Sequence, residues 1–147
     1  MTPWPIAVGV AAPIAGRLAD RHPAGILGGF GLALLAAGLT WLALLQSGPD
    51  HLQIIGAMAL CGMGFGFFQA PNNRMIVSSA PRQRSGAAGG LLATARLLGQ
   101  TSGAVAMAAI FHLDAARPTV TALYLAAAIA AAATILSLLR GRTATER

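Results

Sequence analysis

The chain has 147 residues, of which 56% are hydrophobic and only 10% are charged. Soluble domains carry about 25% charged residues, so this composition excludes an ordinary water-soluble fold. The formal net charge is +6, but the arginines lie at the ends of apolar segments and are not interleaved with aromatic residues, which argues against nucleic acid as a partner.

A short charged segment at residues 16–21 separates the first two apolar stretches. Residues 4–15 carry no charge, and residues 24–46 form a second uncharged run. A helix of about 20 apolar residues spans the hydrocarbon core of a bilayer. We therefore predict membrane helices at about 4–16 and 24–46, joined by a loop.

Three further apolar runs predict helices at about 52–76, 86–112 and 118–139, followed by a tail at 140–147. The predicted fold class is therefore all-α, a polytopic protein of about five transmembrane helices in a lipid bilayer. No nucleophile, base and orienting group are grouped in the sequence, and it holds neither a metal-ligand cluster nor a phosphate-binding loop. We expect no enzymatic activity, no catalytic residues, no metal and no cofactor.

The basic residues are unevenly divided between the two ends of the predicted helices. Eight arginines fall on one side, whereas only Arg117 falls on the other. Short loops rich in Arg stay in the cytoplasm. The loop at 16–21 and the C-terminus are therefore predicted to be cytoplasmic, in a multi-pass protein of the cell inner (plasma) membrane.

The third and fourth predicted helices carry polar side chains inside apolar runs, whereas the second and fifth are mostly Ala, Leu, Ile and Gly. A helix that faces lipid can be uniformly apolar, but one that lines a water-filled path must present polar groups. We predict that the third and fourth helices line a cavity and that the second and fifth lie outside. The candidate cavity or gating residues are Gln69, Pro71, Asn72, Asn73, Arg96 and Gln100.

Arg96 is the one ionisable residue placed well inside a predicted span. Insertion of an Arg there costs at least about 2.5–3.5 kcal/mol unless the side chain reaches water or a partner. Two interpretations stay open: a functional group in a transport path, or a structural group that bonds helix ends or carbonyls. No Asp or Glu lies in any predicted span, so a carboxylate partner or a proton-carrying acid would come from outside this chain.

Small residues and a proline interrupt the third and fourth helices. Small residues one turn apart let two helix backbones approach closely, and these glycines either only pack helices or also let them bend and slide. Pro71 can kink its helix, as a gate or as a packing device, and the sequence does not separate the two. The predicted helix-packing residues are Gly62, Gly66, Gly86, Gly90, Gly99 and Gly103.

Three segments carry a resemblance to a known transporter family. They are residues 13–21 (PIAGRLADR), residues 62–67 (GMGFGF) leading to Pro71-Asn72-Asn73, and residues 79–90 (SAPRQRSGAAGG) leading to Thr94-Ala95-Arg96 and Gly99-Gln100. In this order they resemble the C-terminal part of a major facilitator superfamily transporter, and more narrowly the fourteen-helix drug:proton antiporters, or multidrug exporters. At residues 22–25 the chain departs from the loop signature, which usually continues with Gly and further basic residues.

The resemblance implies a fold of two six-helix bundles, of which the five predicted helices match the last five. It implies alternating access, with a proton gradient as energy source and a small, often apolar, cationic or antibiotic-like compound as substrate. It also implies a cytoplasmic loop signature at Gly16, Asp20 and Arg21. There Gly16 lets helices cross, Asp20 binds a helix N-terminus or an arginine of the neighbouring bundle, and Arg21 binds inner-leaflet charge or a carboxylate. Simple topology marking by Asp20 and Arg21 is the alternative.

A transporter of this kind binds substrate between two repeats, whereas this chain holds less than one bundle. Two hypotheses therefore stay open. The chain is part of a proton-coupled drug or small-molecule efflux antiporter, whose N-terminal helices or another subunit supply the opposite wall. Alternatively, it is a truncated or non-transporting small membrane protein that acts only by assembling with other membrane subunits.

Overall fold

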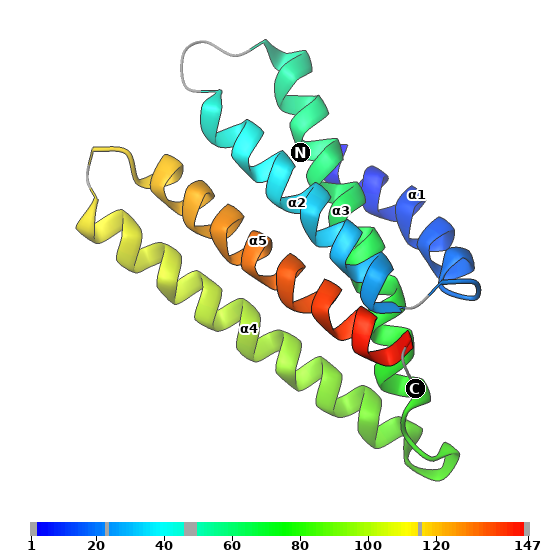
Figure 1. Ribbon diagram of the computed structural model, residues 1–147. Helices are drawn as coiled ribbons and strands as arrows, with labels where there is room; N and C mark the ends of the chain where they lie inside the picture. Colours follow the sequence, from blue (N-terminus) through cyan, green and yellow to red (C-terminus); the bar gives the residue numbers. More distant parts are fainter. Residues whose placement is uncertain (1–2, 23, 46–49, 115, 146–147) are drawn as a thin grey trace.

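The structure, a computed structural model, describes residues 3–22, 24–45, 50–114 and 116–145, and Figure 1 shows their arrangement. No strand occurs in these ranges, and the predicted all-α fold is confirmed. The elements in chain order are α1 (Pro3–Leu18), α2 (Ala24–Leu44), α3 (His51–Ser78), the 3-10 turn η1 (Arg82–Arg84), α4 (Ser85–Leu113) and α5 (Pro118–Thr145).

The first four helices begin and end within two residues of the predicted bounds. The fifth is longer than predicted, because α5 continues past residue 139 to Thr145. The apolar run ends at Leu139, but a helix does not require apolar residues, and Arg140, Arg142 and Ala144 are good helix formers. The predicted tail is therefore helical over residues 140–145, and residues 146 and 147 lie outside the described part.

Three of the described helices are long and apolar enough to cross a membrane: α2, α3 and residues Pro118–Leu139 of α5. The helix α1 has only 16 residues, fewer than the roughly 20 that a bilayer requires. The helix α4 has 29 residues, but its Gly, Ser, Thr, Gln and Arg content lowers its hydropathy. The predicted number of helices is thus present, whereas only three of them meet the composition of a lipid-facing span.

The helix α2 lies at the centre of the packing, between α3 and α5, and α1 packs against the other side of α3. At Gly31 of α2 and Gly64 of α3, the two helix backbones come into direct contact. A β-carbon on Gly31 would lie 2.5 Å from the Phe68 amide nitrogen and 2.7 Å from the Gly64 carbonyl oxygen. About two turns along the same interface, Gly38 makes room for the buried thiol of Cys61. Glycine therefore sets the distance between these helices.

In contrast, α4 stands apart from the other helices. It runs alongside α5 in the opposite direction (Figure 1) and makes only sparse contacts with α3 and α5. None of its residues is buried, and Leu91 and Val105 are 73% and 70% exposed. The space that this separation leaves beside α3 holds the candidate site.

The connections alternate between two ends of the molecule (Figure 1). The α1–α2 and α3–α4 connections lie at one end together with the end of α5, and the α2–α3 and α4–α5 connections lie at the other. This is the alternation that the arginine distribution requires. Which end faces the cytoplasm stays a prediction.

The α4–α5 connection is held by the carboxylate of Asp114. Its Oδ1 accepts hydrogen bonds from the amides of Ala116 at 3.2 Å and Arg117 at 3.1 Å, and its Oδ2 accepts one from the Thr121 hydroxyl at 2.5 Å. The hydrogen bonds from Thr121 and from the Arg117 amide lower the pKa of the carboxyl, because they stabilise its ionised form. Asp114 thereby fixes the start of α5.

Candidate functional site

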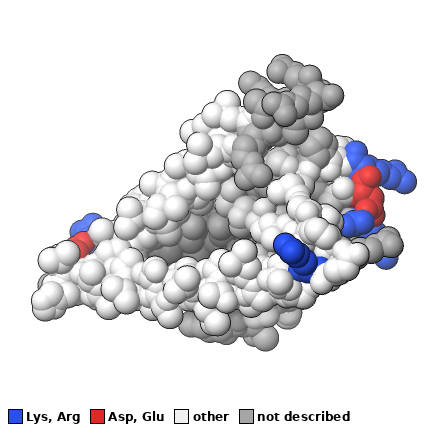
Figure 2. Space-filling view, turned by 90° about the horizontal axis from the view of Figure 1, so that it is seen from below, with Lys and Arg blue, Asp and Glu red and all other residues white. Residues whose placement is uncertain are grey.

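A cavity of about 340 Å³ lies between α3 and α4. Seen from below the view of Figure 1, the surface is hollowed and mostly uncharged, with the charged side chains gathered in small groups (Figure 2). Cavities that bind small molecules have volumes from about 300 to 1,000 Å³. The lining residues are Phe65, Phe68, Gln69, Asn72, Asn73, Leu92, Arg96, Gly99 and Gln100.

Helical spacing explains why these residues face one cavity. Residues three and four positions apart share a face of an α-helix. On α3 this spacing links Phe65 to Gln69 and Gln69 to Asn72, and on α4 it links Arg96 to Gln100. Other positions of the same helix, Gly62, Gly64 and Gly66, pack against α1 and α2. The helix α3 therefore contacts the bundle through glycines and lines the cavity with larger and polar side chains.

Five of the six candidate cavity or gating residues lie around this cavity, and none of their side chains has a hydrogen bond or ion pair within the described ranges. Gln69 Oε1 is buried without a hydrogen-bond partner. Buried polar atoms in proteins are nearly always hydrogen-bonded. These groups are therefore available to water, a bound molecule or a neighbouring chain. They are Gln69, Asn72, Asn73, Arg96 and Gln100.

Pro71, the sixth candidate, lies away from the cavity. It is fully buried and lines a separate hollow of about 330 Å³ beside the α1–α2 connection. The helix α3 continues through Pro71 to Ser78 without a break. Pro71 therefore belongs to the packed face of α3, and its role as a gate stays a prediction.

The apolar part of the cavity wall was missed from the sequence. Phe65 and Phe68 contribute ring surface, and Phe65 also packs against Trp4 with ring centroids 5.8 Å apart. The spacing of four between Phe65 and Gln69 is the sequence signal that could have identified it. Among the described residues there is no group of three or more His, Cys, Asp or Glu that could hold a metal ion.

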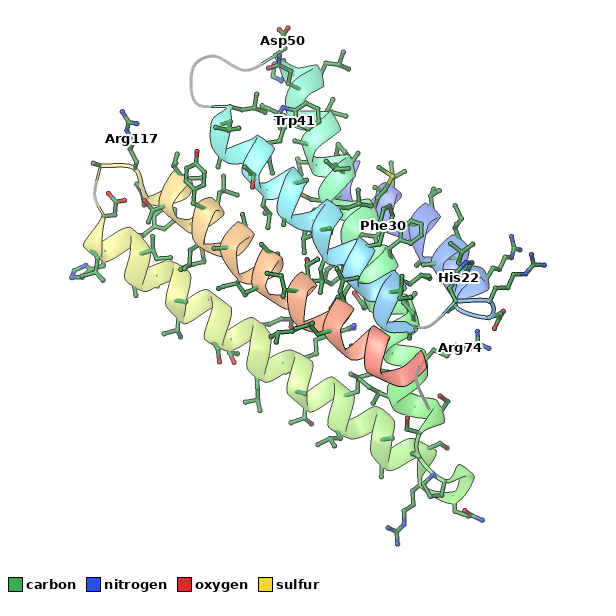
Figure 3. The ribbon with its side chains drawn as sticks, in the orientation of Figure 1. His22, Phe30, Trp41, Asp50, Arg74 and Arg117 are labelled. Atoms are coloured by element: carbon green, nitrogen blue, oxygen red, sulfur yellow. The ribbon has the colours of Figure 1, made fainter. Side chains whose placement is uncertain are left out.

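The predicted loop signature forms an ion pair within the chain itself. Arg74 Nη1 of α3 lies 2.5 Å from Asp20 Oδ1 and also donates to the Gly16 carbonyl oxygen at 3.4 Å. Figure 3 shows Arg74 extending toward the connection that carries His22. Within this chain the partner of Asp20 is thus Arg74 of α3, and a contact of Asp20 with a helix N-terminus or with an arginine of a neighbouring bundle stays a prediction. Arg21 is exposed and makes no ion pair within the described ranges.

The predicted packing glycines divide into two groups. Gly62 and Gly66 lie against α1, where an added β-carbon would be 2.9 Å from the β-carbons of Ala7 and Ala11, respectively. The glycines of α4 and Gly16 have nothing within 4 Å of such an atom. They therefore make no close packing contact within the described part, and a packing role against other helices stays a prediction. These residues are Gly16 of the loop signature and Gly86, Gly90, Gly99 and Gly103 of α4.

A sequence model of the Major Facilitator Superfamily matches residues 1–147 of the chain. The chain belongs to this superfamily. The resemblance that the loop and helix segments carry is thereby confirmed, and membership in the superfamily makes the chain a membrane protein and supports a carrier rather than an enzyme.

The chain is similar in sequence to proteins that are named as transporters or as a multidrug resistance protein. It is 51% identical over 140 residues to the uncharacterized transporter YebQ of Escherichia coli (strain K12), a match that covers 95% of the chain and 31% of YebQ. It is 32% identical to the riboflavin transporter RibZ of Clostridioides difficile (strain 630), over 76% of the chain and 24% of RibZ. It is 30% identical to the multidrug resistance protein Stp of Mycobacterium tuberculosis (strain ATCC 25618 / H37Rv), over 69% of the chain and 19% of Stp.

The chain spans less than a third of the length of these relatives. No solved structure gives a significant match. The transport activity of a whole protein, and any part that the α3–α4 cavity takes in it, therefore belong to the proposal that follows.

Proposed function

We propose that this chain forms the cavity-lining part of a proton-coupled small-molecule efflux antiporter that works by alternating access. The observation that carries the proposal is the group of five polar side chains around one cavity, without partners within the described ranges. In an apolar bundle such groups are costly unless water or a bound molecule satisfies them. Membership in the Major Facilitator Superfamily supports a transport role for this cavity.

The packing supports a division between a rigid part and a movable part. Glycine contacts lock α2 to α3 and α1 to α3 at backbone distance. No residue of α4 is buried, and its contacts with α3 and α5 are sparse. A helix with so few buried contacts can move at low cost relative to the bundle. We infer that α4 shifts against α3 when the cavity changes its access.

Proton coupling in this proposal requires an acid from outside the five helices. The four acidic residues of the sequence lie in connections or near the C-terminus, and none lies in a predicted span. The opposite wall of the site and the proton-carrying acid would come from N-terminal transporter helices or another subunit. Arg96 is the basic residue of the cavity wall with which a carboxylate from the opposite wall would pair.

A split-transporter experiment tests the proposal. The chain is expressed in bacteria alone and together with the part of YebQ outside the matched segment, and retention of an anionic and a cationic dye is measured. We expect uncoupler-sensitive loss of at least one dye only when both parts are present, and loss of that activity in the Asn72→Leu variant. The matched control is Ile129→Ala, which removes an exposed side chain of α5.

The alternative function is that of a small membrane protein that transports nothing and acts by assembling with other subunits. The exposure of α4 along its length favours this alternative, because its exposed apolar residues can pack against a helix of another subunit. Stable association with the YebQ part without dye loss would support this alternative. Dye loss that persists in Asn72→Leu would contradict the assignment of the cavity.

A further inference from the structure

The charge of the cavity wall has one sign. Arg96 is the only ionisable group among the lining residues. Of the acidic residues in the described ranges, Asp20 and Asp114 lie in connections and Asp50 precedes the first turn of α3. A molecule that enters the cavity therefore meets a positive charge without a compensating carboxylate among these residues.

Arg96 lies in the inner part of α4, away from the helix ends, where lipid headgroups are expected. It is about 16 Å along α4, which at 29 residues is about 43 Å long. Headgroups begin at the edges of a hydrocarbon core that is about 30 Å thick. A ligand for Arg96 at this depth is a molecule that enters the cavity, whereas a headgroup would have to leave the interface.

The remaining wall combines amides with a flat ring. Gln69, Asn72 and Gln100 each offer N–H donors, and carboxylates accept hydrogen bonds from such donors. Phe68 lines the cavity and has no aromatic partner within the described ranges, so it offers a ring on which an aromatic ligand could stack. The volume of about 340 Å³ is near the lower end for ligand cavities. A small flat molecule with an acidic group fits this combination.

Resting on the proposed function, we propose that this cavity selects a planar organic anion of the aromatic carboxylate class. The carboxylate binds the guanidinium of Arg96, the amides hold its second oxygen, and the ring lies against Phe68. A guanidinium and a carboxylate can form two parallel hydrogen bonds, which gives both affinity and orientation. A cationic compound of the same size would place two like charges in one cavity.

Two probes that differ mainly in charge test the proposal: dansylglycine, which is an aromatic carboxylate, and a dansyl-trimethylammonium conjugate. Each is titrated into the full chain in phosphatidylcholine nanodiscs, and binding is followed by energy transfer from tryptophan. Hydrogen bonds to a charged group contribute enough that dansylglycine should bind at least about tenfold more tightly than the cation. Equal binding, or tighter binding of the cation, would overturn the proposal.

Variants assign the preference to Arg96. Arg96→Gln should remove most of the preference for dansylglycine over the cationic probe. Arg96→Lys should retain part of this preference because the positive charge remains. Arg84→Gln, which removes the same charge just before α4 begins and outside the cavity, should leave it unchanged. A preference that survives Arg96→Gln in a variant with unchanged circular dichroism would overturn the proposal. The proposal would also be overturned if phosphatidylglycerol displaced dansylglycine from the original chain but not from Arg96→Gln. Arg96 would then bind a lipid headgroup.

The Asn72→Leu variant separates this inference from the proposed function. If both probes lose affinity in Asn72→Leu while the cation binds better than the anion, the cavity binds ligands and only the anion class is wrong. If neither probe responds to Asn72→Leu, the cavity is not their site and both proposals fail. Dansylglycine binding that requires both Asn72 and Arg96 supports both.

Discussion

The crossing of α2 and α3 at glycine predicts a large difference between two substitutions of the same kind. A β-carbon on Gly64 would lie 2.7 Å from the Gly31 carbonyl oxygen and closer still to the Leu35 amide nitrogen. A β-carbon on Gly90 of α4 would meet nothing within 4 Å. Both Gly→Ala changes gain about 1 kcal/mol of helix propensity, so this term cancels in the comparison. The difference between the variants then measures the steric conflict at the crossing.

The steric cost follows from what must move. Overpacking a well-packed interface costs about 1–3 kcal/mol, and the upper part of that range applies here because the opposing atoms are backbone. We therefore expect Gly64→Ala to be less stable than Gly90→Ala by about 2–3 kcal/mol, which is about 30- to 150-fold in the unfolding equilibrium. Gly90→Ala should be at least as stable as the original chain.

Unfolding in dodecyl sulfate, followed by circular dichroism in mixed micelles, measures this difference. Helix content at saturating denaturant provides the reference state for each variant. Equal midpoints for Gly64→Ala and Gly90→Ala would refute the reasoning, because they would mean that the two helices do not cross at backbone distance.

Three further predictions use other parts of the fold. Cys61, the only cysteine, is 0% exposed, so it should react with a maleimide only after unfolding, which mass spectrometry detects; rapid labelling of the folded chain would contradict its burial. The exposed pair Asp20 and Arg74 should show a coupling of about 0.2–1 kcal/mol in a double-mutant cycle at low salt, and zero coupling would argue against the pair. The folded pKa of Asp114 is lowered by its hydrogen bonds from Thr121 and the Arg117 amide, so the stability it contributes is complete above its unfolded pKa of about 4 and is lost as pH falls through the folded value. Asp114→Asn should flatten the acid limb of a pH titration of stability, and an unchanged limb would contradict this.

The helices and the identity of the cavity-facing pair could be predicted from the sequence because both depend on local composition. Uncharged runs locate the helices, and α4 differs from α2 by polar residues that lipid would not accept. Arg96 and Gln100 therefore point to a polar path before any contact is known. The resemblance to a superfamily transporter, confirmed by the family match, rests on segments that are likewise continuous in the chain.

The contacts between distant segments could not be predicted in the same way. The pair Asp20 and Arg74 joins residues 54 positions apart, and arginine counting treats Arg74 only as a marker of topology. Glycine spacing shows that a helix can pack closely, but it does not name the partner. Gly90 fits the packing pattern and faces open space, whereas Gly31, which we did not select, lies where the α2 and α3 backbones touch.

The central claim is that the space between α3 and α4 is a water-filled path, and thiol accessibility tests it most directly. In a Cys61→Ala background, a charged, membrane-impermeant methanethiosulfonate is applied to the chain in nanodiscs. The target variants are Asn73→Cys and Gln100→Cys, which lie on the cavity wall. The matched control is Val105→Cys, which lies nine positions from Arg96 and therefore on the opposite face of the same helix.

Thiols react with this reagent as thiolates, which require water. We predict rapid modification of both cavity variants and slow modification of Val105→Cys. Equally slow modification of Asn73→Cys, Gln100→Cys and Val105→Cys would show that lipid or protein fills the cavity, and would contradict the account.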